Sequence, residues 1–377
     1  MKKRVVAMVL VGGRGTRLGK ITKTTAKPAV TFGGKYKLID FVLSNLSNSS
    51  INTIGIITQY EPYELLSYIE HGSTWDLDVN EAGVSFLTPY TSTAGELWQK
   101  GTAHSVYQHF RFIDQYDPDY VLILSGDHVY KMDYNKLIEA HKEHKSDVTI
   151  STFEVNDDPS RYGILDLDEY GNVLSFEEKP KHPKSKIASM GIYVFSKEVL
   201  RTLLQDAYIR SQFDFGKDII PLALEKKLKV CGYKFDGYFR DVGTIKSLYE
   251  ANMDILDKPH YLKTYDYNDF PILTKSSNLP PHHIIYSDKI SNSLISDGCL
   301  ISGEIRHSIL SSGVVVTEGC RIKDSIIHSN VKIGKNSIIE NAFIIKNSVV
   351  LANSVLVFDE VTVVDNEFLW KMGDSHE

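Results

Sequence analysis

Apolar runs alternate with helical patterns through the first 250 residues of the chain. Val5–Val11 is continuously apolar, which is typical of a strand buried on both faces of a parallel sheet. The pattern predicts further strands at 51–58, 120–125 and 147–155, and helices at 41–49 and 102–116. Such alternation predicts an α/β open sheet, in which ligands bind beyond the carboxyl ends of the strands.

The pattern changes after about residue 255, where scattered prolines and few periodic signals predict a linker over 255–290. Beyond it, apolar residues recur every six positions, which matches neither a helix nor a simple strand. The period predicts a hexapeptide β-helix over 291–377, whereas the short strands of a β-sandwich would be spaced less regularly. One series is Ile327, Ile333, Ile339, Ile345, Leu351 and Val357, and an earlier one, out of phase by one residue, is Leu310, Val316 and Ile322.

Charge and cysteine content narrow the class of protein. The net charge of -6 argues against a broad nucleic-acid surface. Cys231, Cys299 and Cys320 form no CxxC pair, which argues against a disulfide scaffold or zinc cluster and favours the cytoplasm. No stretch approaches the ~20 apolar residues of a membrane span. The basic N-terminus before Val5–Val11 imitates a signal peptide, but glycines follow in place of a cleavage site, so we interpret the run as a buried strand.

The first predicted strand leads into a glycine loop, GGRGTRLGK, at 12–20. Its spacing fits neither the dinucleotide fingerprint nor a Walker loop. Glycines nevertheless let backbone N–H groups approach phosphate oxygens, and Arg14, Arg17 and Lys27 can add charge-assisted hydrogen bonds. Taken alone, the loop is more typical of a strand-to-helix turn whose arginines are solvated.

Several motifs along the whole chain resolve this ambiguity, because together and in order they resemble those of bacterial ADP-glucose pyrophosphorylases. The motifs are GGRGTRL (12–18), AKPAV (26–30), FGGKYKLIDFVLSN (32–45), ITQYEPYEL (57–65), WQKGTAHSV (98–106), LILSGDHVYKMDY (122–134), FEEKP (176–180), ASMGIYVF (188–195), DFGKDIIP (214–221) and YFRDVGT (238–244). The resemblance implies a Rossmann-like, mixed-sheet nucleotidyltransferase domain over 1–254, followed by the linker and a left-handed parallel β-helix.

The resemblance also implies an activity and a catalytic group. Members of the family join ATP and glucose 1-phosphate into ADP-glucose and release pyrophosphate, in the step that commits glucose to bacterial glycogen. Asp127 and Asp241 are expected to hold a Mg²⁺ ion, which usually takes one or two carboxylates plus substrate phosphates. Arg17 and Lys27 are expected to join Asp127 as catalytic residues, whereas Asp133 reads as the N-cap of the next helix.

Substrate contacts follow from the same resemblance. The nucleotide is expected to contact Gly12, Gly13, Gly15, Thr16, Arg17, Lys27, Gly101 and Thr102, with the last two near the base. The sugar phosphate is expected to contact Gly163, Glu178, Lys179 and Ser189. Gln99 departs from the pattern, since many members have an aromatic residue there. It keeps a donor and an acceptor but loses stacking area.

Regulation and assembly are implied only by resemblance. The family forms tetramers with β-helix contacts, so we expect a homotetramer or a heterotetramer with a regulatory paralogue. Thr24 and Thr25 stand where some members activated by sugar bisphosphates carry basic residues, so we expect a weak response to such effectors. Gln59 and Trp98, positions that the family links to effector signalling, are both present.

Three other functions stay open on the sequence alone. A related enzyme would use another sugar phosphate or nucleotide, as mannose-1-phosphate guanylyltransferases do. A non-catalytic regulatory subunit would share the fold but tends to lose the glycine loop or the aspartates, which this chain keeps. An acyltransferase would use the β-helix and a coil histidine, for which His307 and His328 are the candidates.

Overall fold

The computed structural model describes residues 4–12, 15–23, 25–58, 62–89, 91–92, 95–96, 99–155, 158–262 and 270–373. The chain forms two compact units, each assembled from separate segments. The described residues within 1–13, 42–126 and 130–239 make the first unit, and those within 14–41, 127–129 and 240–377 make the second. Across the described part of the chain, no helix combines the length and apolarity needed to cross a membrane.

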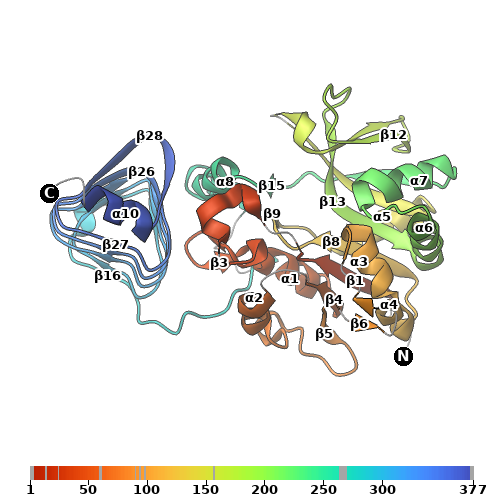
Figure 1. Ribbon diagram of the computed structural model, residues 1–377, viewed down its shortest axis with the longest axis horizontal. Coiled ribbons are helices and arrows are strands. Elements are labelled where there is room, and N and C mark those ends of the chain that lie inside the picture. The colour runs from red at the N-terminus through yellow and green to blue at the C-terminus, as the bar shows by residue number, and fades with distance from the viewer. Residues whose placement is uncertain are drawn as a thin grey trace. The chain divides into compact units, whose positions relative to one another are not determined.

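A nine-stranded sheet forms the centre of the first unit (Figure 1). Strand β1 pairs in parallel with β8 and β4, and β13 runs antiparallel beside β8. The expected sheet of mixed strand direction is therefore confirmed. Its strands are β1 (Val5–Leu10), β4 (Thr53–Ile57), β5 (Gly83–Leu87), β8 (Tyr120–Ser125), β10 (Val148–Glu154), β11 (Gly163–Leu167), β12 (Val173–Glu178), β13 (Ile187–Ser196) and β14 (Val230–Lys234). A separate hairpin joins β6 (Thr91–Ser92) and β7 (Gly95–Glu96).

Helices α3, α4 and α6 bury their apolar faces against this sheet (Figure 1). Val106, Ile113 and Leu203 from these helices join Val6 and Ile123 from the strands in one core. Burial on this scale removes apolar area from water and is the main stabilising contribution. The helices are α1 (Leu38–Asn48), α2 (Pro62–Ile69), α3 (Thr102–Gln108), α4 (Phe110–Tyr116), α5 (Tyr134–Glu143), α6 (Lys197–Ile209) and α7 (Ile220–Glu225).

The single helix predicted over 102–116 is wrong, because the structure has two. The backbone at His109 has φ -100° and ψ 16°, which ends α3, and α4 begins at the next residue. Both helices bury apolar residues on the same side, so the apolar pattern runs on across the break. The other predicted elements are present, with ends that differ by a few residues.

The second unit contains a stack of short parallel strands (Figure 1). Successive coils pair in register, as Val316 with Ile333 and Ile322 with Ile339. Its strands are β16 (His283–Ile284), β17 (Ile290–Ser291), β18 (Leu294–Ile295), β19 (Leu300–Ile301), β20 (Glu304–Arg306), β21 (Ile309–Leu310), β22 (Val315–Val316), β23 (Arg321–Lys323), β24 (Ile326–Ile327), β25 (Lys332–Ile333), β26 (Ile338–Ile344), β27 (Val349–Val350) and β28 (Val355–Val364). The predicted parallel β-helix is confirmed.

The inward positions of this β-helix differ from the predicted series after Ile339. From β20 to β27, neighbouring coils are offset by 17 residues, as the side-chain hydrogen bond between Asn330 and Asn347 illustrates, so one of the three hexads in these coils is a residue short. The buried residues are accordingly Ile344, Val350 and Leu356. The predicted series contains Ile345, Leu351 and Val357 in their place. Leu351 and Val357 are 64% and 50% exposed.

The rest of the second unit connects the N-terminal loop to these coils. It also contains β2 (Thr31–Phe32), β3 (Tyr36–Lys37), α8 (Ile245–Asp257), α9 (Pro259–Leu262), α10 (Asn366–Gly373) and most of β9 (His128–Tyr130) and β15 (Phe239–Asp241). α8 begins at a capping box made by Thr244 and Ser247, which satisfies two N–H groups of its first turn. α10 buries Leu369 in the core of the β-helix (Figure 1).

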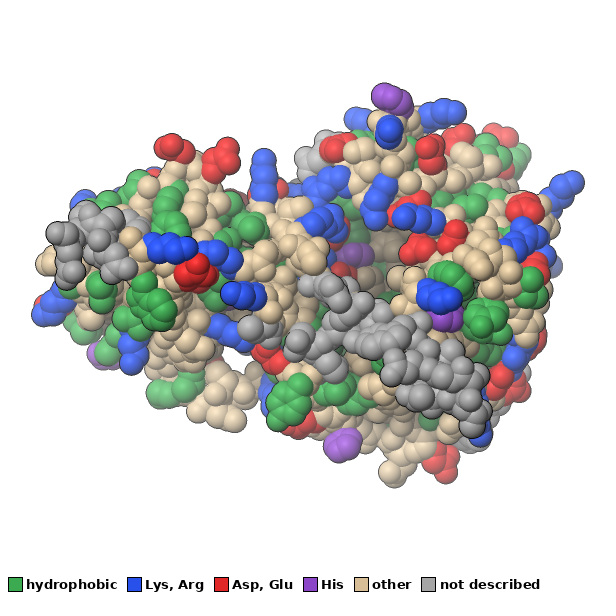
Figure 2. Space-filling model, viewed as in Figure 1, with side chains coloured by type: hydrophobic (Ala, Val, Ile, Leu, Met, Phe, Trp, Pro, Cys, Tyr) green, Lys and Arg blue, Asp and Glu red, His purple; other side chains and the backbone are tan. Residues whose placement is uncertain are grey.

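Charged side chains of both signs are interspersed over the face shown in Figure 2. Lysines and arginines stand among aspartates and glutamates on the described part of that face. This distribution agrees with the acidic net charge of the chain.

Candidate functional site

Two distant aspartates meet at one lysine in the second unit. Lys27 Nζ lies 2.8 Å from Asp127 Oδ2 and 3.2 Å from Asp241 Oδ1. Asp127 precedes β9 and Asp241 ends β15, and these two strands pair with each other. Both predicted metal ligands therefore lie within hydrogen-bond distance of the same ammonium. Among the described residues, no group of three or more His, Cys, Asp or Glu gathers as a metal site.

Burial makes this pairing electrostatically strong. Lys27 has only 7% of its side chain exposed, and the side chains of Asp127 and Asp241 have 23% and 16%. Burial alone would lower the pKa of Lys27, but the charges of Asp127 and Asp241 outweigh it and the pKa is raised. Burial would likewise raise the pKa of Asp241, but Lys27 and then His128 hold it below its ordinary value. Lys27 and Asp241 are therefore both charged at neutral pH.

His128 belongs to the same cluster, although the sequence analysis did not select it. Its Nε2 lies 3.6 Å from Asp127 Oδ1 and 3.9 Å from Asp241 Oδ1. These separations exceed ordinary hydrogen-bond lengths, so the imidazole acts on the two carboxylates mainly through charge when it is protonated. The signal for His128 was its position directly after Asp127 in the SGDHVY motif.

The glycine loop approaches this cluster from the N-terminal side. Gly15 has φ 60° and ψ 26°, a left-handed conformation that suits glycine, and its carbonyl accepts a hydrogen bond from Thr22 Oγ1 at 2.8 Å. A Cβ built on Gly15 would lie 3.2 Å from Lys27 Cβ. Thr16 and Arg17 follow in an exposed 3₁₀ turn. Gly12 lies in the first unit directly after β1, and Gly13 lies outside the described residues.

Gly243 leaves room for Arg17 beside Asp241. A Cβ built on Gly243 would lie 2.8 Å from a terminal guanidinium nitrogen of Arg17 and 3.1 Å from Asp241 Oδ1. Only a residue without a side chain leaves room for both groups. Arg17 has no hydrogen-bond or ion-pair partner among the described residues, so its guanidinium is available to an anionic ligand.

We expect Gly243→Ala to lower kcat/KM about tenfold while changing the free energy of unfolding by less than about 1 kcal/mol. The added methyl group meets the flexible end of Arg17, which can move aside without disturbing the backbone. Steady-state kinetics and denaturant unfolding measure the two quantities. In an Arg17→Ala background the same change is expected to have little further effect, and full additivity of the two losses would contradict this explanation.

A second cluster, in the first unit, forms around Glu178. Gly163 and Glu178 are paired across β11 and β12. Cβ atoms built on Gly163 and Gly216 would lie 2.8 Å and 2.6 Å from Glu178 Oε2, so both glycines leave room for this carboxylate. Lys179 follows with its Nζ 3.1 Å from Glu178 Oε1, and 58% of its side chain is exposed. The structure thus brings together three of the four residues predicted to bind the sugar phosphate.

Asp214 connects this cluster to the residues predicted to lie near the base. Thr102 Oγ1 donates to Asp214 Oδ2 at 3.1 Å and accepts from the backbone N–H of Phe215 at 3.1 Å. A Cβ on Gly101 would lie 2.4 Å from the carbonyl oxygen of Phe213, so the close approach of these two segments requires glycine there. A Cβ on Gly216, which adjoins Glu178, would lie 3.5 Å from Asp214 Oδ1.

The fourth predicted residue, Ser189, is linked to the cluster through Tyr193. Its hydroxyl lies 3.4 Å from the hydroxyl of Tyr193, and both side chains are buried. Burial raises the pKa of Tyr193, and the charges of Glu178 and Asp214 raise it further, so the phenol is neutral and can donate a hydrogen bond. Asp214 and Tyr193 were missed at the sequence level, although both lie in quoted motifs.

Gln99 and Asp133 are both held in local structure. Gln99 is buried and its Oε1 accepts a hydrogen bond from Ser105 Oγ at 3.1 Å, at the beginning of α3. Asp133 is the N-cap of α5, and its side chain accepts from the backbone N–H of Asn135, which confirms the predicted role. Gln59, Trp98 and Thr24 lie outside the described residues.

The two coil histidines proposed for acyl transfer are both engaged in structure. His328 is buried, and its ring packs against Phe343 with the centroids 4.7 Å apart. His307 lies between two carboxylates, with Nδ1 2.5 Å from Asp324 and Nε2 3.0 Å from Asp257. These contacts tie the β-helix to the end of α8, and they give the acyltransferase alternative no support.

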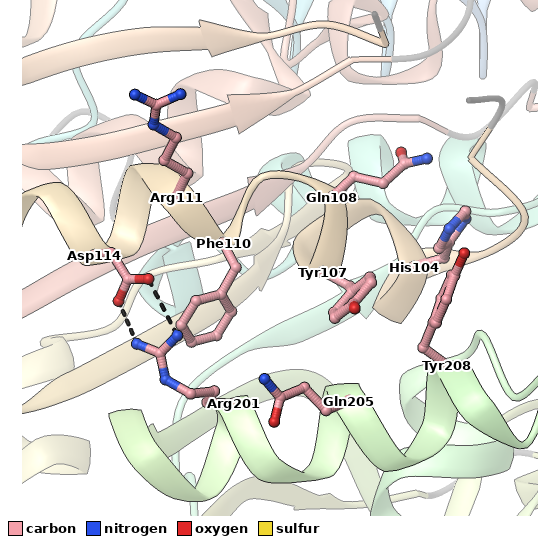
Figure 3. Close-up of a pocket in the computed structure, with 9 residues that line it drawn as sticks. All are labelled: His104, Tyr107, Gln108, Phe110, Arg111, Asp114, Arg201, Gln205 and Tyr208. Carbon is pink, nitrogen blue, oxygen red and sulfur yellow. Dashed lines mark hydrogen bonds and ion pairs between the residues drawn. The ribbon is translucent and has the colours of Figure 1, made fainter. Parts of the chain in front are cut away.

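A pocket of about 380 Å³ lies between α3, α4 and α6 (Figure 3). In Figure 3 the guanidinium of Arg201 lies between the carboxylate of Asp114 and the ring of Phe110, at 4.6 Å from the ring centroid. Tyr107 and Tyr208 stack with their centroids 4.7 Å apart. No residue predicted from the sequence to bind substrate or metal lines this pocket.

Known protein families match both the N-terminal and the C-terminal part of the chain. Residues 6–258 match the family model described as nucleotidyl transferase, and residues 282–368 match the GlmU-like C-terminal hexapeptide model. The chain is 49% identical over 346 residues to glucose-1-phosphate adenylyltransferases of Bacillus thuringiensis (strain Al Hakam), Bacillus cereus (strain ATCC 14579) and Bacillus anthracis. The match covers 91% of this chain and 92% of each relative.

The chain belongs to the glucose-1-phosphate adenylyltransferase family. The family match spans both the Lys27 cluster and the Glu178 cluster, so the two groups of polar residues are parts of a nucleotidyltransferase fold.

Proposed function

We propose that this chain transfers the AMP group of ATP to glucose 1-phosphate, giving ADP-glucose and pyrophosphate, as the committed step of bacterial glycogen synthesis. An oxygen of the sugar phosphate attacks the α-phosphorus of ATP, a new P–O bond forms, and the bond to the leaving pyrophosphate breaks. The observation that carries the proposal is the convergence of Asp127 and Asp241 on Lys27 beside Arg17. It is supported by the 49% identity to named adenylyltransferases.

The cationic residues of the second unit bind the nucleotide in this proposal. Lys27 and Arg17, which has no partner within the described part of the chain, supply charge-assisted hydrogen bonds to the triphosphate, and Arg17 stabilises the charge that develops on the leaving pyrophosphate. Gly12, Gly13, Gly15 and Thr16 offer backbone N–H groups, and Gly101 and Thr102 lie near the base.

The acidic pair suits a divalent ion. Asp127 and Asp241 are both half-buried carboxylates beside the same ammonium, and two carboxylates plus substrate phosphates form a set of oxygen ligands that Mg²⁺ accepts. When bound, the ion would neutralise charge on the phosphates and bring the two anionic reactants within reach of each other.

The Glu178 cluster orients the sugar phosphate. Glu178 accepts hydrogen bonds from glucose hydroxyls, and Lys179 binds the phosphate as a point charge. Gly163 leaves room for the carboxylate, and Ser189 contributes a hydroxyl. We add Asp214 and Tyr193 to this group, because Asp214 approaches the glycine beside Glu178 and Tyr193 contacts Ser189.

We further propose that residues 1–254 act as the catalytic domain, 255–290 as a linker and 291–377 as the β-helix domain. The protein is cytoplasmic in this proposal, with its three described cysteines free. It assembles into a homotetramer, or a heterotetramer with a regulatory paralogue. It responds weakly to fructose 1,6-bisphosphate, since Thr25 offers a hydroxyl, which Lys346 Nζ already contacts at 3.1 Å, in place of a cation.

Turnover of the purified full-length chain tests the proposal directly. ATP, glucose 1-phosphate and Mg²⁺ are expected to yield ADP-glucose and pyrophosphate in equal amounts, measured by chromatography and a coupled pyrophosphate assay. GTP, UTP and dTTP, and mannose 1-phosphate, serve as competing substrates, and preference for one of these would favour a related nucleotidyltransferase. Absence of any turnover by the chain alone would favour the regulatory-subunit alternative.

A further inference from the structure

The two carboxylates beside Lys27 need a nearby positive charge whether or not a metal is bound. Two carboxylates, Asp127 and Asp241, both lie within hydrogen-bond distance of its Nζ, so their mutual repulsion is offset by a single positive charge. The ammonium neutralises half of the combined charge of the pair. A divalent ion would neutralise all of it, but an ion held by both carboxylates would compete with the ammonium for the same oxygens.

The backbone and Cβ of Lys27 are held in place, whereas its long side chain can move the ammonium from one partner to another. Lys27 begins a 3₁₀ turn that continues into Pro28, and its carbonyl accepts a hydrogen bond from the N–H of Val30 at 3.0 Å. Its Cβ lies against Gly15, whose left-handed conformation holds the glycine loop close. A triphosphate on this loop would therefore approach the four-carbon stem of Lys27, which is long enough to turn the ammonium away from the aspartates.

We propose that Lys27 is an internal counter-ion that occupies the divalent-metal position between Asp127 and Asp241 until a bound triphosphate draws its ammonium away. The metal site is thereby kept weak in the free protein and becomes strong only together with the nucleotide. The inference rests on the proposed function for the identity of the nucleotide and of the metal, but not for the position of the ammonium.

This arrangement couples the two ligands thermodynamically. The metal must displace an ammonium from the carboxylates, which lowers its affinity for the free protein. The phosphates offer that ammonium new acceptors, so metal and nucleotide each increase the affinity for the other by the same factor. Without the ammonium at position 27, the carboxylates would be available at once, and metal affinity would no longer depend on the nucleotide through this route.

Binding of Mn²⁺ as the probe tests the proposal on the nucleotide-free, full-length protein, with free Mn²⁺ measured by electron paramagnetic resonance. We expect Lys27→Gln to bind Mn²⁺ about tenfold more tightly than the wild type, and Lys27→Arg to bind it as weakly as the wild type. Lys23→Gln, which changes an exposed lysine of the same segment, is the matched control and is expected to behave as the wild type. Affinity in Lys27→Gln equal to or below that of the wild type would overturn the proposal.

Two further measurements locate the effect. Adding Asp241→Asn to Lys27→Gln is expected to abolish the gain in Mn²⁺ affinity, and a gain that persists would overturn the proposal. α,β-Methylene-ATP is expected to tighten Mn²⁺ binding to the wild type about tenfold beyond the affinity of the analogue alone, and to do so less in Lys27→Gln. Equal tightening in both proteins would also overturn it.

Stability gives an independent readout. Without metal, Lys27→Gln removes the ammonium that lies between two half-buried carboxylates, so its unfolding temperature is expected to fall below that of the wild type and to be recovered by millimolar Mn²⁺. A variant that is unfolded without the ion and folds only with it supports the proposal, and one that Mn²⁺ does not stabilise overturns it. A wild type that binds Mn²⁺ as proposed but makes no ADP-glucose would instead overturn the proposed function alone.

Discussion

Asp127→Asn is expected to lower kcat for ADP-glucose synthesis by about three to four orders of magnitude. The amide carries no charge, so the proposed metal site would lose one of its two carboxylates. A positioned metal supplies several kcal/mol of transition-state stabilisation, and each 1.36 kcal/mol corresponds to about a factor of ten in rate. Initial rates at saturating ATP and glucose 1-phosphate, over a range of Mg²⁺ concentrations, measure the loss and show how much added metal recovers.

Asp133→Asn is the matched control for this experiment. Asp133 lies six positions further along the chain and caps α5, and asparagine caps a helix about as well as aspartate does. We expect this variant to retain nearly full activity and stability. If Asp127→Asn keeps its fold and turns over within about tenfold of the wild type, Asp127 is not a metal ligand in the reaction.

Much of the fold follows from local sequence patterns. The continuous apolar run of β1 and the alternation of strands and helices were enough to predict the sheet, because burial on both faces leaves no polar positions in a strand. The break between α3 and α4 was not visible, since both helices bury the same side and no glycine or proline marks His109. The position of this break depends on tertiary packing, which the local apolar pattern does not reveal.

The β-helix shows how a regular pattern can mislead about individual residues. Adjacent apolar pairs such as Ile344–Ile345 and Leu356–Val357 let a six-residue count continue smoothly on the wrong member of each pair. The coils that contain these pairs are 17 residues long, so the inward position moves back by one at a short corner. The fold class was therefore predictable from the period, but the inward residues required the register between coils.

The candidate site, too, was only partly predictable from the sequence. Glycines, arginines and the two aspartates were identified by their motifs, and no sequence spacing could show that Lys27 reaches Asp127 and Asp241 at once. That contact arises because β9 and β15, far apart in the chain, pair with each other. Asp214 and Tyr193 were missed for a related reason: their relation to Glu178 and Ser189 depends on contacts between separate segments.

Lys179→Gln is expected to raise KM for glucose 1-phosphate by roughly tenfold to a hundredfold, with much smaller changes in kcat and in KM for ATP. Lys179 has φ 51°, an uncommon conformation for a residue other than glycine, at the end of β12. Within the described part of the chain, its exposed ammonium forms an ion pair only with Glu178, so it can turn to a phosphate. A hydrogen bond to a charged group contributes about 1.5–3 kcal/mol, which corresponds to this range of affinity.

Steady-state kinetics with each substrate varied in turn separate this role from a general loss of activity. Lys181→Gln, which removes an exposed lysine two residues later, is expected to leave both KM values unchanged. Lys179→Arg keeps the charge and is expected to recover part of the lost affinity, since a guanidinium also binds phosphate but with a different geometry. A rise in KM for ATP as large as that for glucose 1-phosphate would assign Lys179 to the nucleotide instead, because a residue that binds only the sugar phosphate contributes nothing to the affinity for ATP.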